Sequence, residues 1–261
     1  MRIITCNVRA STMALDLGPR LWKNRKDLCL ETILKTAPDV ICLQECQMEQ
    51  LQDFRQALEP EWGAFWMRLA PDGGPENVIF YRRAFADISD HGGYWLSDTP
   101  HVPGSKSWGS ECVRLANFTV LETADGPVRI LNTHTDHASQ TAREKQTQMM
   151  IDESVYWGNM PQIITGDLNC DVNNPAIQLW LQNNWRDTHF EATGIRDERF
   201  TAHDFLGEAW QGDRGICGNG KMDWILVKGP LRSVSSCLVT DRDGELYPSD
   251  HYFVAAELAF E

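Results

Sequence analysis

The sequence predicts an α/β fold in which two β-sheets pack against each other with helices on the outside. Three observations support this prediction. Short apolar runs of strand length recur along the chain, turn signals separate them, and few segments have helical periodicity. The chain has 261 residues, 42% of them hydrophobic, with ten tryptophans and no low-complexity tract. This composition is typical of a globular protein and excludes intrinsic disorder, collagen-like repeats and a membrane-embedded chain.

Ten runs have strand composition and end at turn signals. They are residues 2–8, 39–43, 63–69, 76–82, 113–122, 127–134, 161–166, 222–228, 233–239 and 252–260. Four other segments predict helices: 22–37, 47–58, 139–157 and 174–184. The third helix is expected to expose Arg143 on a polar face and to turn Met150, Ile151 and Val155 toward a core.

Two glycine-containing segments, 86–112 and 186–221, are expected to be long loops. Loops of this length inside a compact domain are usually functional rims or disordered. Neither segment has the composition of a linker, so the chain is expected to form a single domain over residues 1–261.

The charge of the chain bears on its partners. There are 24 Lys and Arg residues against 37 Asp and Glu, which gives a formal net charge of −13. Proteins that hold duplex DNA without sequence preference usually do so through a basic surface. A local basic cleft or a bound divalent metal reverses the local field. The acidic balance nevertheless favours small phosphorylated substrates over nucleic acid.

The eight cysteines are scattered and form no Cys-x-x-Cys pair, which favours free thiols over disulfides. Residues 1–8 have the pattern of a strand and not of a signal peptide. No apolar run reaches the length of about 18 residues that a transmembrane helix needs. We therefore expect a reduced, monomeric protein located in the cytoplasm, without a membrane partner.

Polar side chains of a few kinds lie at the ends of the predicted strands. They are Asn7, Glu45, His134, Asp167, Asn169, Asp223, Asp250 and His251. Rigid elements that end together can aim such side chains at one cleft. These eight residues are therefore candidates for one site.

Six motifs carry these residues. They are Thr-Cys-Asn at 5–7, Leu-Gln-Glu at 43–45, Asn-Thr-His at 132–134, Gly-Asp-Leu-Asn at 166–169, Met-Asp-Trp-Ile at 222–225 and Ser-Asp-His at 249–251. In this order the set resembles the endonuclease/exonuclease/phosphatase superfamily, which includes DNase I, abasic-site endonucleases, inositol-polyphosphate 5-phosphatases, neutral sphingomyelinases and the nocturnin group. The resemblance covers essentially the whole chain, and the region from Phe80 to Ser97, followed by Arg114, is similar to small bacterial-type members. One departure is Thr135-Asp136-His137, where the family usually has Leu after the first His.

The resemblance implies a four-layered α/β/β/α sandwich of two mostly antiparallel sheets. It also implies hydrolysis of phosphate esters with Mg²⁺ or Mn²⁺ as cofactor. The metal ligands that it implies are Asn7, Glu45 and Asp250, of which Glu45 is the principal one. Oxygen ligands of this kind are those that Mg²⁺ prefers.

The remaining motif residues acquire catalytic roles by the same resemblance. Asp167 is implied as the general base for the attacking water, with Asn169 positioning it. His251, kept protonated by Asp223, and His134 are implied as donors to the phosphate. These residue types suit phosphoryl transfer, which needs an oriented, deprotonated water and neutralised charge.

Each motif by itself has a simpler explanation. Glu45 could open a helix after a strand, Gly-Asp-Leu-Asn is commonly a β-turn, and Asp250-His251 is commonly a cap. His134 and His137 could form a zinc pair, but no Cys or third His follows at a useful spacing. Six motifs in one order at strand ends favour the joint explanation.

Other residues have two explanations each. Arg114 is a candidate for substrate binding together with His134 and Asn169, or it pairs with a buried acid. The dipeptide Glu76-Asn77 faces the cleft or forms a turn, and Thr201-Ala202-His203 is a substrate-contacting rim or a solvated loop. Three loop tryptophans stack on a base or sugar, or cover the small core of their own loops: Trp95, Trp108 and Trp210.

The leading functional hypothesis is a Mg²⁺-dependent phosphoesterase, acting on a mono- or diester of a phosphorylated small molecule or a short nucleic acid. The first alternative is a nuclease acting on ends or single strands of DNA or RNA. A catalytically inactive binding module is disfavoured because every motif position is intact. A lipid phosphodiesterase is disfavoured because no hydrophobic anchoring segment is present. Specificity in this family lies in the loops, so the natural substrate stays open.

Overall fold

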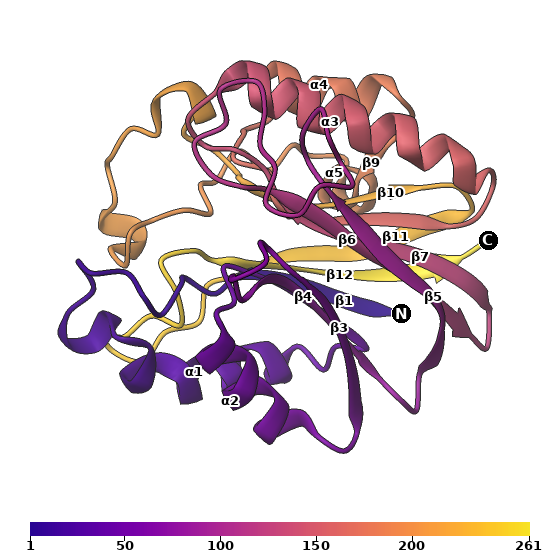
Figure 1. Ribbon diagram of the computed structural model, residues 1–261. Coiled ribbons are helices and arrows are strands. Elements are labelled where there is room, and N and C mark those ends of the chain that lie inside the picture. Colours follow the sequence, from indigo (N-terminus) through magenta and orange to yellow (C-terminus); the bar gives the residue numbers. More distant parts are fainter.

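The computed structural model describes all 261 residues and contains two six-stranded sheets that pack face to face (Figure 1). The first sheet has the order β11-β12-β1-β2-β4-β3. Its strands are β1 (Arg2–Asn7), β2 (Val40–Gln44), β3 (Trp62–Arg68), β4 (Pro75–Arg82), β11 (Leu231–Val239) and β12 (Phe253–Phe260). Only β1 and β2 pair in parallel.

The second sheet has the order β5-β6-β7-β8-β10-β9. Its strands are β5 (Ala86–Trp95), β6 (Leu115–Thr123), β7 (Gly126–His134), β8 (Gln162–Asp167), β9 (Arg186–Asp187) and β10 (Asp223–Lys228). Here only β7 and β8 are parallel. Both sheets are therefore mostly antiparallel, as expected.

Helices cover the outer faces of both sheets (Figure 1). The helices α1 (Trp22–Lys35) and α2 (Met48–Leu58) share a core with the first sheet, and α3 (Gln140–Ser154) and α4 (Pro175–Gln182) share one with the second. The short α5 (Thr188–Thr193) packs beside β11. Single-turn 3₁₀ helices occupy Gly18–Arg20, Val155–Trp157, Gly207–Ala209 and Gly215–Cys217. The four-layered α/β/β/α prediction is confirmed.

Alternation along the strands places apolar side chains on both faces of each sheet. In β1, Ile3 joins the core between the two sheets, whereas Ile4 and Cys6 join the core under α1 and α2. The same alternation in β10 sends Ile225 between the sheets and Trp224 toward α3 and α4. Residues two apart therefore share a face, and this periodicity positions the polar residues described below.

The layer between the sheets is apolar at one end and polar at the other. A buried hydrogen-bond network joins the two sheets there: Gln44 Nε2 donates to Asn132 Oδ1 at 2.6 Å, and Asn132 Nδ2 donates to the carbonyl oxygen of Leu43 at 2.8 Å. Thr5 and Thr165 extend the network on either side. The polar ends of β1, β2, β7, β8 and β10 thus lie next to this buried hydrogen-bond network.

The expectation that residues 86–112 form one long loop is wrong, because 86–95 form β5. This strand contains acidic residues and the Gly92-Gly93 pair, which are unfavourable for strands, so composition concealed it. It lies at the edge of its sheet and pairs with β6 along its length. Residues 186–221 likewise contain β9 and α5, although most of that segment is irregular.

Two expectations for α3 are also wrong. Arg143 is fully buried, and its guanidinium donates to the carbonyl oxygens of Asp136 and Ile216 at 2.6 and 3.2 Å. Val155 is 67% exposed, because the helix gives way to a 3₁₀ turn there. Met150 and Ile151 are buried as expected.

The eight cysteines are all free, and six of them are buried. None of the helices is both long enough and apolar enough to cross a membrane.

Candidate active site

Asp167 is the centre of the polar cluster. It ends β8, where it lies in register with His134 of β7 on one side and with Asp223 of β10 on the other. Its carboxylate is 2% exposed and accepts hydrogen bonds from Asn7 Nδ2 at 3.0 Å and from the Asn169 backbone N–H at 2.9 Å. Strand pairing and alternation therefore bring together residues that are far apart in the sequence.

The pKa of Asp167 reflects two opposing influences. Burial raises it, but the imidazoles of His134 and His251, together with the hydrogen bonds from Asn169 and Asn7, lower it further than burial raises it. The pKa is therefore below its usual value, and the carboxylate is ionised at neutral pH. An ionised carboxylate in a buried cluster can accept a proton.

His251 and Asp223 form a buried pair beside Asp167. His251 Nδ1 lies 2.8 Å from Asp223 Oδ2, and His251 Nε2 lies 3.9 Å from Asp167 Oδ2. Burial alone would lower the pKa of His251, but Asp223, Asp167 and Asp250 raise it to about 10. The imidazole is therefore protonated at neutral pH, with Nε2–H directed toward the Asp167 side of the site.

The hydroxyl group of Thr201 fixes the backbone at Asp223. Thr201 Oγ1 accepts hydrogen bonds from the backbone N–H groups of Met222 and Asp223, at 2.8 and 3.2 Å. His203 is fully buried, its backbone N–H donates to the Asp250 carbonyl oxygen at 2.8 Å, and burial with the nearby His251 lowers its pKa to about 3. Residues 201–203 are therefore a buried support of the site, and the solvated-loop explanation is wrong.

Glu45 reaches the cluster through an unusual backbone conformation. Its φ is +58°, in the left-handed region that few non-glycine residues adopt. Glu45 Oε1 accepts from Asn7 Nδ2 at 3.1 Å, and Oε2 accepts from the Ala10 backbone N–H at 3.0 Å. Asn7 Nδ2 therefore bridges the carboxylates of Glu45 and Asp167.

Asp250 contacts a basic residue that the motifs did not single out. Arg9 Nη1 lies 3.1 Å from Asp250 Oδ2, and the same guanidinium makes two bonds to Asp16, at 3.1 and 3.2 Å. The backbone N–H of Arg9 also donates to Asn7 Oδ1 at 3.0 Å. Arg9 thus links the segment after β1 to the segment before β12 at the edge of the site.

Arg114 lies on the opposite edge and is paired with a buried acid. Arg114 Nη1 donates to Glu76 Oε1 at 2.6 Å, and that oxygen lies 3.4 Å from His134 Nδ1. The guanidinium is 5% exposed, and its Nη2 lies 3.5 Å from His137 Nδ1. Arg114 is therefore paired with a buried acid, which is one of the two explanations given for it. Glu76 faces the site, which is one of the two explanations given for Glu76-Asn77.

His134 and Asn169 complete the cluster. Asn169 Nδ2 lies 2.9 Å from His134 Nε2 and donates to the Thr135 carbonyl oxygen at 3.1 Å. Asn169 has a φ of +45°, which turns its side chain back toward β7. Its amide therefore touches His134, while its backbone N–H holds Asp167.

The three tryptophans Trp95, Trp108 and Trp210 make contacts within the protein. Trp95 Nε1 donates to the Leu69 carbonyl oxygen at 2.6 Å, and Trp108 Nε1 donates to Asp98 at 3.0 Å. Trp210 packs on Phe200 with ring centroids 5.3 Å apart. The contacts of Trp108 and Trp210 lie within their own loops, whereas Trp95 ends β5 and bonds to the segment after β3.

The donor set of the cluster fits a hard divalent cation. Glu45 and Asn7 offer oxygen ligands on one side of Asp167, and the carboxylates of Asp167 and Asp223 have ligand atoms within 4.8 Å of each other. The protonated His251 imidazole is a hydrogen-bond donor here and not a ligand. The buried atoms Glu76 Oε2 and Asp223 Oδ1 have no hydrogen-bond partner in the protein. A carboxylate-rich, partly unsatisfied set of this kind suits Mg²⁺ or Mn²⁺ better than a thiolate-preferring metal.

The structure brings seven of the eight candidate residues into one cluster and places Asp250 at its edge. The sequence analysis did not single out Arg9 or Asp16, and it gave Ser249 no role within its motif. Ser249 Oγ donates to the Asn7 carbonyl oxygen at 2.7 Å and so ties Asp250 to β1. The sequence does contain a signal for Arg9, because a basic residue two positions after Asn7 is expected to lie beside an acidic site. Nothing comparable marked Asp16.

A four-layered sandwich with a carboxylate, imidazole and amide cluster at the strand ends defines a class of phosphoester-cleaving proteins. The chain belongs to the Endonuclease/Exonuclease/phosphatase family, whose model matches residues 4–251. Members of this family are hydrolases of phosphoester bonds and are generally dependent on divalent metals.

Three relatives illustrate the likeness. The mannosyl-6-phosphatase of Bacteroides thetaiotaomicron VPI-5482 is 25% identical, with a TM-score of 0.87 and 100% of both chains covered. An endonuclease/exonuclease/phosphatase from Bacteroides vulgatus is 26% identical, with a TM-score of 0.85 and coverage of 100% and 98%. An uncharacterized protein of Acanthamoeba polyphaga mimivirus is 30% identical over 119 residues, which are 40% of this chain and 17% of that protein. The chain thus matches only a small part of the viral relative.

Proposed function

We propose that this protein is a divalent-metal-dependent phosphoesterase that hydrolyses a phosphate ester of a small molecule, with residues 1–261 acting as one catalytic domain. The observation that carries the proposal is the geometry of one buried cluster: Asp167 accepts hydrogen bonds from Asn7 and Asn169, and His251, paired with Asp223 at 2.8 Å, lies beside it. The lowered pKa of Asp167 and the raised pKa of His251 agree with an ionised carboxylate beside a protonated imidazole. Two neighbouring groups of this kind supply a proton acceptor and a proton donor at neutral pH.

The proposed roles follow from the contacts. Asp167 accepts a proton from the water that attacks phosphorus, and Asn169 holds Asp167 through its backbone N–H at 2.9 Å. His251 Nε2–H donates to a phosphate oxygen, and Asp223 keeps that imidazole oriented and charged through the bond at 2.8 Å. His134 donates to the developing charge from the other side of Asp167.

The proposed metal site is at the Glu45 side of the cluster. Glu45 and Asn7 would hold Mg²⁺ or Mn²⁺, with Asp250 as a further ligand, and the cation would supply neutralisation of the phosphate charge. Arg9 Nη1 lies 3.1 Å from Asp250 Oδ2 at this edge. The cation of Arg9 therefore partly offsets the acidic residues of this edge.

A small substrate is favoured over a long nucleic acid. The formal net charge of −13 opposes a polyanion, and Arg114, which shares the Glu76 carboxylate with His134, is already paired. The similar phosphatase from Bacteroides is named for a phosphorylated sugar. These observations together support a phosphorylated metabolite.

The test is a substrate panel with purified protein. Hexose 6-phosphates, nucleoside monophosphates, p-nitrophenyl phosphate, bis-p-nitrophenyl phosphate, single-stranded oligonucleotides and plasmid DNA are each incubated with Mg²⁺, Mn²⁺ or EDTA. We expect metal-dependent hydrolysis of a small ester, abolished in Asp167→Asn. Equal rates in the variant would identify a contaminant and overturn the proposal, and a clear preference for oligonucleotides would support the nuclease alternative instead.

A further inference from the structure

The two residues of the buried His251–Asp223 pair come from different sheets. Asp223 begins β10 of the second sheet, whereas His251 lies just before β12 of the first. The strands β10 and β12 do not pair, because β10 has β8 and β9 as its neighbours and β12 has β1 and β11. The 2.8 Å contact between His251 Nδ1 and Asp223 Oδ2 therefore depends on something other than a shared ladder of backbone hydrogen bonds.

A third segment, residues 201–203, fixes the backbone at His251. Ala202 forms an isolated antiparallel β-bridge with His251. The backbone N–H of Tyr252 donates to the Thr201 carbonyl oxygen at 2.9 Å. The segment 201–203 thus acts as a short extra strand against which His251 is held.

The same segment fixes Asp223 through one side chain. Thr201 is fully buried, and its Oγ1 accepts from the backbone N–H groups of Met222 and Asp223 at 2.8 and 3.2 Å. The backbone of Thr201 is bonded beside His251, and its side chain is bonded at the start of β10. Thr201 therefore connects the two members of the pair across the two sheets.

The hydrogen-bond capacity of the Thr201 hydroxyl leaves one proton to account for. A hydroxyl group has two lone pairs and one proton, and the two N–H groups use both lone pairs of Thr201 Oγ1. Asp223 Oδ1 is buried without a hydrogen-bond partner, since His251 bonds the other carboxylate oxygen. A buried donor and a buried acceptor left unpaired each cost free energy, so a bond between these two groups satisfies both.

The surroundings of Asp223 favour such a donor. Burial raises the pKa of this carboxyl group above its usual value, and the nearby Asp167 adds to the rise. The charge of His251 and the hydrogen bonds from His251 and Thr201 act in the opposite direction. Thr201 is thus a neutral group that favours the carboxylate form of Asp223.

From these contacts we propose that Thr201 is a positioning residue, whose Oγ–H donates to Asp223 Oδ1 and keeps Oδ2 aimed at His251 Nδ1. The inference rests on the proposed function, in which His251 Nε2–H donates to a phosphate oxygen. Thr201 itself does not touch the phosphate, and it acts through Asp223 on the orientation of the imidazole. Because that donor matters most where charge develops in the transition state, loss of the hydroxyl should lower kcat more than it raises KM.

The first test compares two changes at one position. Thr201→Val keeps the shape of the side chain and removes the hydroxyl, so kcat should fall about tenfold while KM stays within about twofold. Thr201→Ser keeps the hydroxyl and should stay within about twofold of the unaltered kcat. The control is Thr188→Val, the same change at another fully buried threonine, whose hydroxyl bonds Ser236 Oγ at 3.3 Å. An unaltered kcat in Thr201→Val, or an equal loss in Thr188→Val, would overturn the proposal.

A double-mutant cycle tests whether Thr201 acts through the Asp223 carboxylate. In an Asp223→Asn background, Thr201→Val should change kcat by at most about twofold, because residues of one hydrogen-bond network have non-additive effects. A loss of about tenfold in both backgrounds would show that the hydroxyl acts independently of Asp223, and the proposal would be wrong.

Proton NMR of the metal-free protein without substrate gives a readout that does not depend on hydrolysis. The Nδ1–H proton of His251 should give a downfield, slowly exchanging signal. Thr201→Val should move this signal upfield, whereas Thr201→Ser and Thr188→Val should leave it in place. An unchanged signal in Thr201→Val would refute the role of Thr201 alone, and absence of any hydrolysis with the expected NMR result would refute the proposed function alone.

A measurement on the unaltered protein decides the matter if Thr201→Val does not fold. The Thr201 hydroxyl proton should exchange slowly with water and show a nuclear Overhauser contact to the backbone amide proton of Asp223. A hydroxyl proton in fast exchange with water would contradict a buried bond to the Asp223 carboxylate and would overturn the proposal.

Discussion

Asp167 is the residue whose surroundings constrain the proposed chemistry most. Asn7, His134, Asn169 and His251 all have a polar atom within 3.9 Å of its carboxylate. A general base is useful only when it is ionised and held in place, and these contacts do both.

Asp167→Asn removes the proton acceptor and keeps the shape of the side chain. We expect turnover to fall at least about a hundredfold, because general bases contribute roughly 10²–10⁴ in rate. The measurement is kcat on the best substrate of the panel, alongside thermal unfolding. Asp87→Asn, an exposed change on β5, is the control. Near-normal turnover in Asp167→Asn would mean that another group accepts the proton.

Arg9→Gln tests the edge at which metal binding is proposed. Removing the cation leaves Asp16 and Asp250 without their shared partner, so we expect the free energy of unfolding to drop by about 1–3 kcal/mol. The same loss of positive charge should strengthen Mn²⁺ binding several-fold in calorimetry. Weaker Mn²⁺ binding would instead indicate that Arg9 positions Asp250 as a ligand.

The His251–Asp223 pair predicts a particular pH dependence. The pKa of His251 is raised from 6.5 to about 10 in the folded protein. The stability that the charged imidazole contributes is therefore fully present below pH 6.5 and is lost as pH rises through 10. Asp223→Asn removes the main partner of His251, so the pKa of His251 should fall in this variant.

Urea unfolding of the metal-free protein at pH 7 and pH 10 measures this linkage. The unaltered protein should lose more stability between the two pH values than Asp223→Asn does. Comparing the two proteins cancels the other groups that titrate near pH 10. Equal losses in both proteins, or an NMR titration of His251 near 6.5, would contradict the assignment of a protonated imidazole.

At the scale of elements, adjacent strands carry the site. His134, Asp167 and Asp223 are cross-strand neighbours on β7, β8 and β10. Gly166 makes this possible, because a Cβ there would lie 2.0 Å from the Thr133 carbonyl oxygen. The close approach of β8 to β7 sets the separation of His134 and Asp167.

The edge strand β5 depends on a second close approach. A Cβ at Gly93 would lie 2.4 Å from the Ala116 carbonyl oxygen and 2.5 Å from Met67 Sδ, whereas one at Gly92 would contact only the Phe118 ring, at 3.1 Å. We expect Gly93→Ala to reduce the free energy of unfolding by about 1–3 kcal/mol, and Gly92→Ala to cost less. Chemical denaturation of the two variants measures this difference, and equal stabilities would contradict the predicted packing.

At the scale of the whole molecule, charge governs access by polyanions. We expect kcat/KM on plasmid duplex to be lower than on the best small ester at roughly 0.15 M salt, where surface charges are screened beyond about 8 Å. The acidic surface supplies few of the Lys and Arg contacts that duplex binding needs. A clear preference for the plasmid would reveal a local basic face that outweighs the net charge of −13.

Most strands and helices followed from local pattern, because apolar runs bounded by turn signals are sufficient to identify a buried strand. β5 did not, since its residues are poor strand formers and only pairing with β6 makes them extended. Arg143 looked exposed for a similar reason: its carbonyl partners lie in distant segments, which no local pattern reveals.

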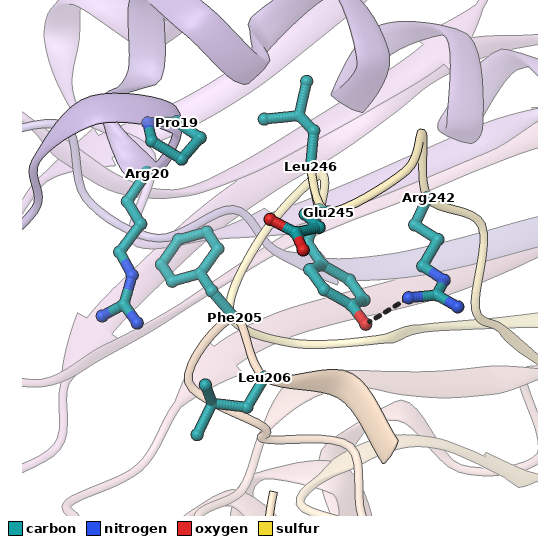
Figure 2. Close-up of a pocket in the computed structure, with 8 residues that line it drawn as sticks. Pro19, Arg20, Phe205, Leu206, Arg242, Glu245 and Leu246 are labelled. Atoms are coloured by element: carbon teal, nitrogen blue, oxygen red, sulfur yellow. Dashed lines mark hydrogen bonds between the residues drawn. The ribbon is translucent and has the colours of Figure 1, made fainter. Parts of the chain in front are cut away.

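The sequence by itself determined the family, the four-layered architecture and the identity of the polar residues at the strand ends. These follow from motifs and alternation, which are properties of neighbouring residues. Only the tertiary structure decided that Arg114 pairs with Glu76 and that Arg9 joins Asp16 to Asp250. It also decided that Arg20, Phe205 and Arg242, from three distant segments, line one surface hollow of about 400 Å³ (Figure 2). Such pairings depend on distances between segments far apart in the chain, and those distances exist only once the two sheets have packed.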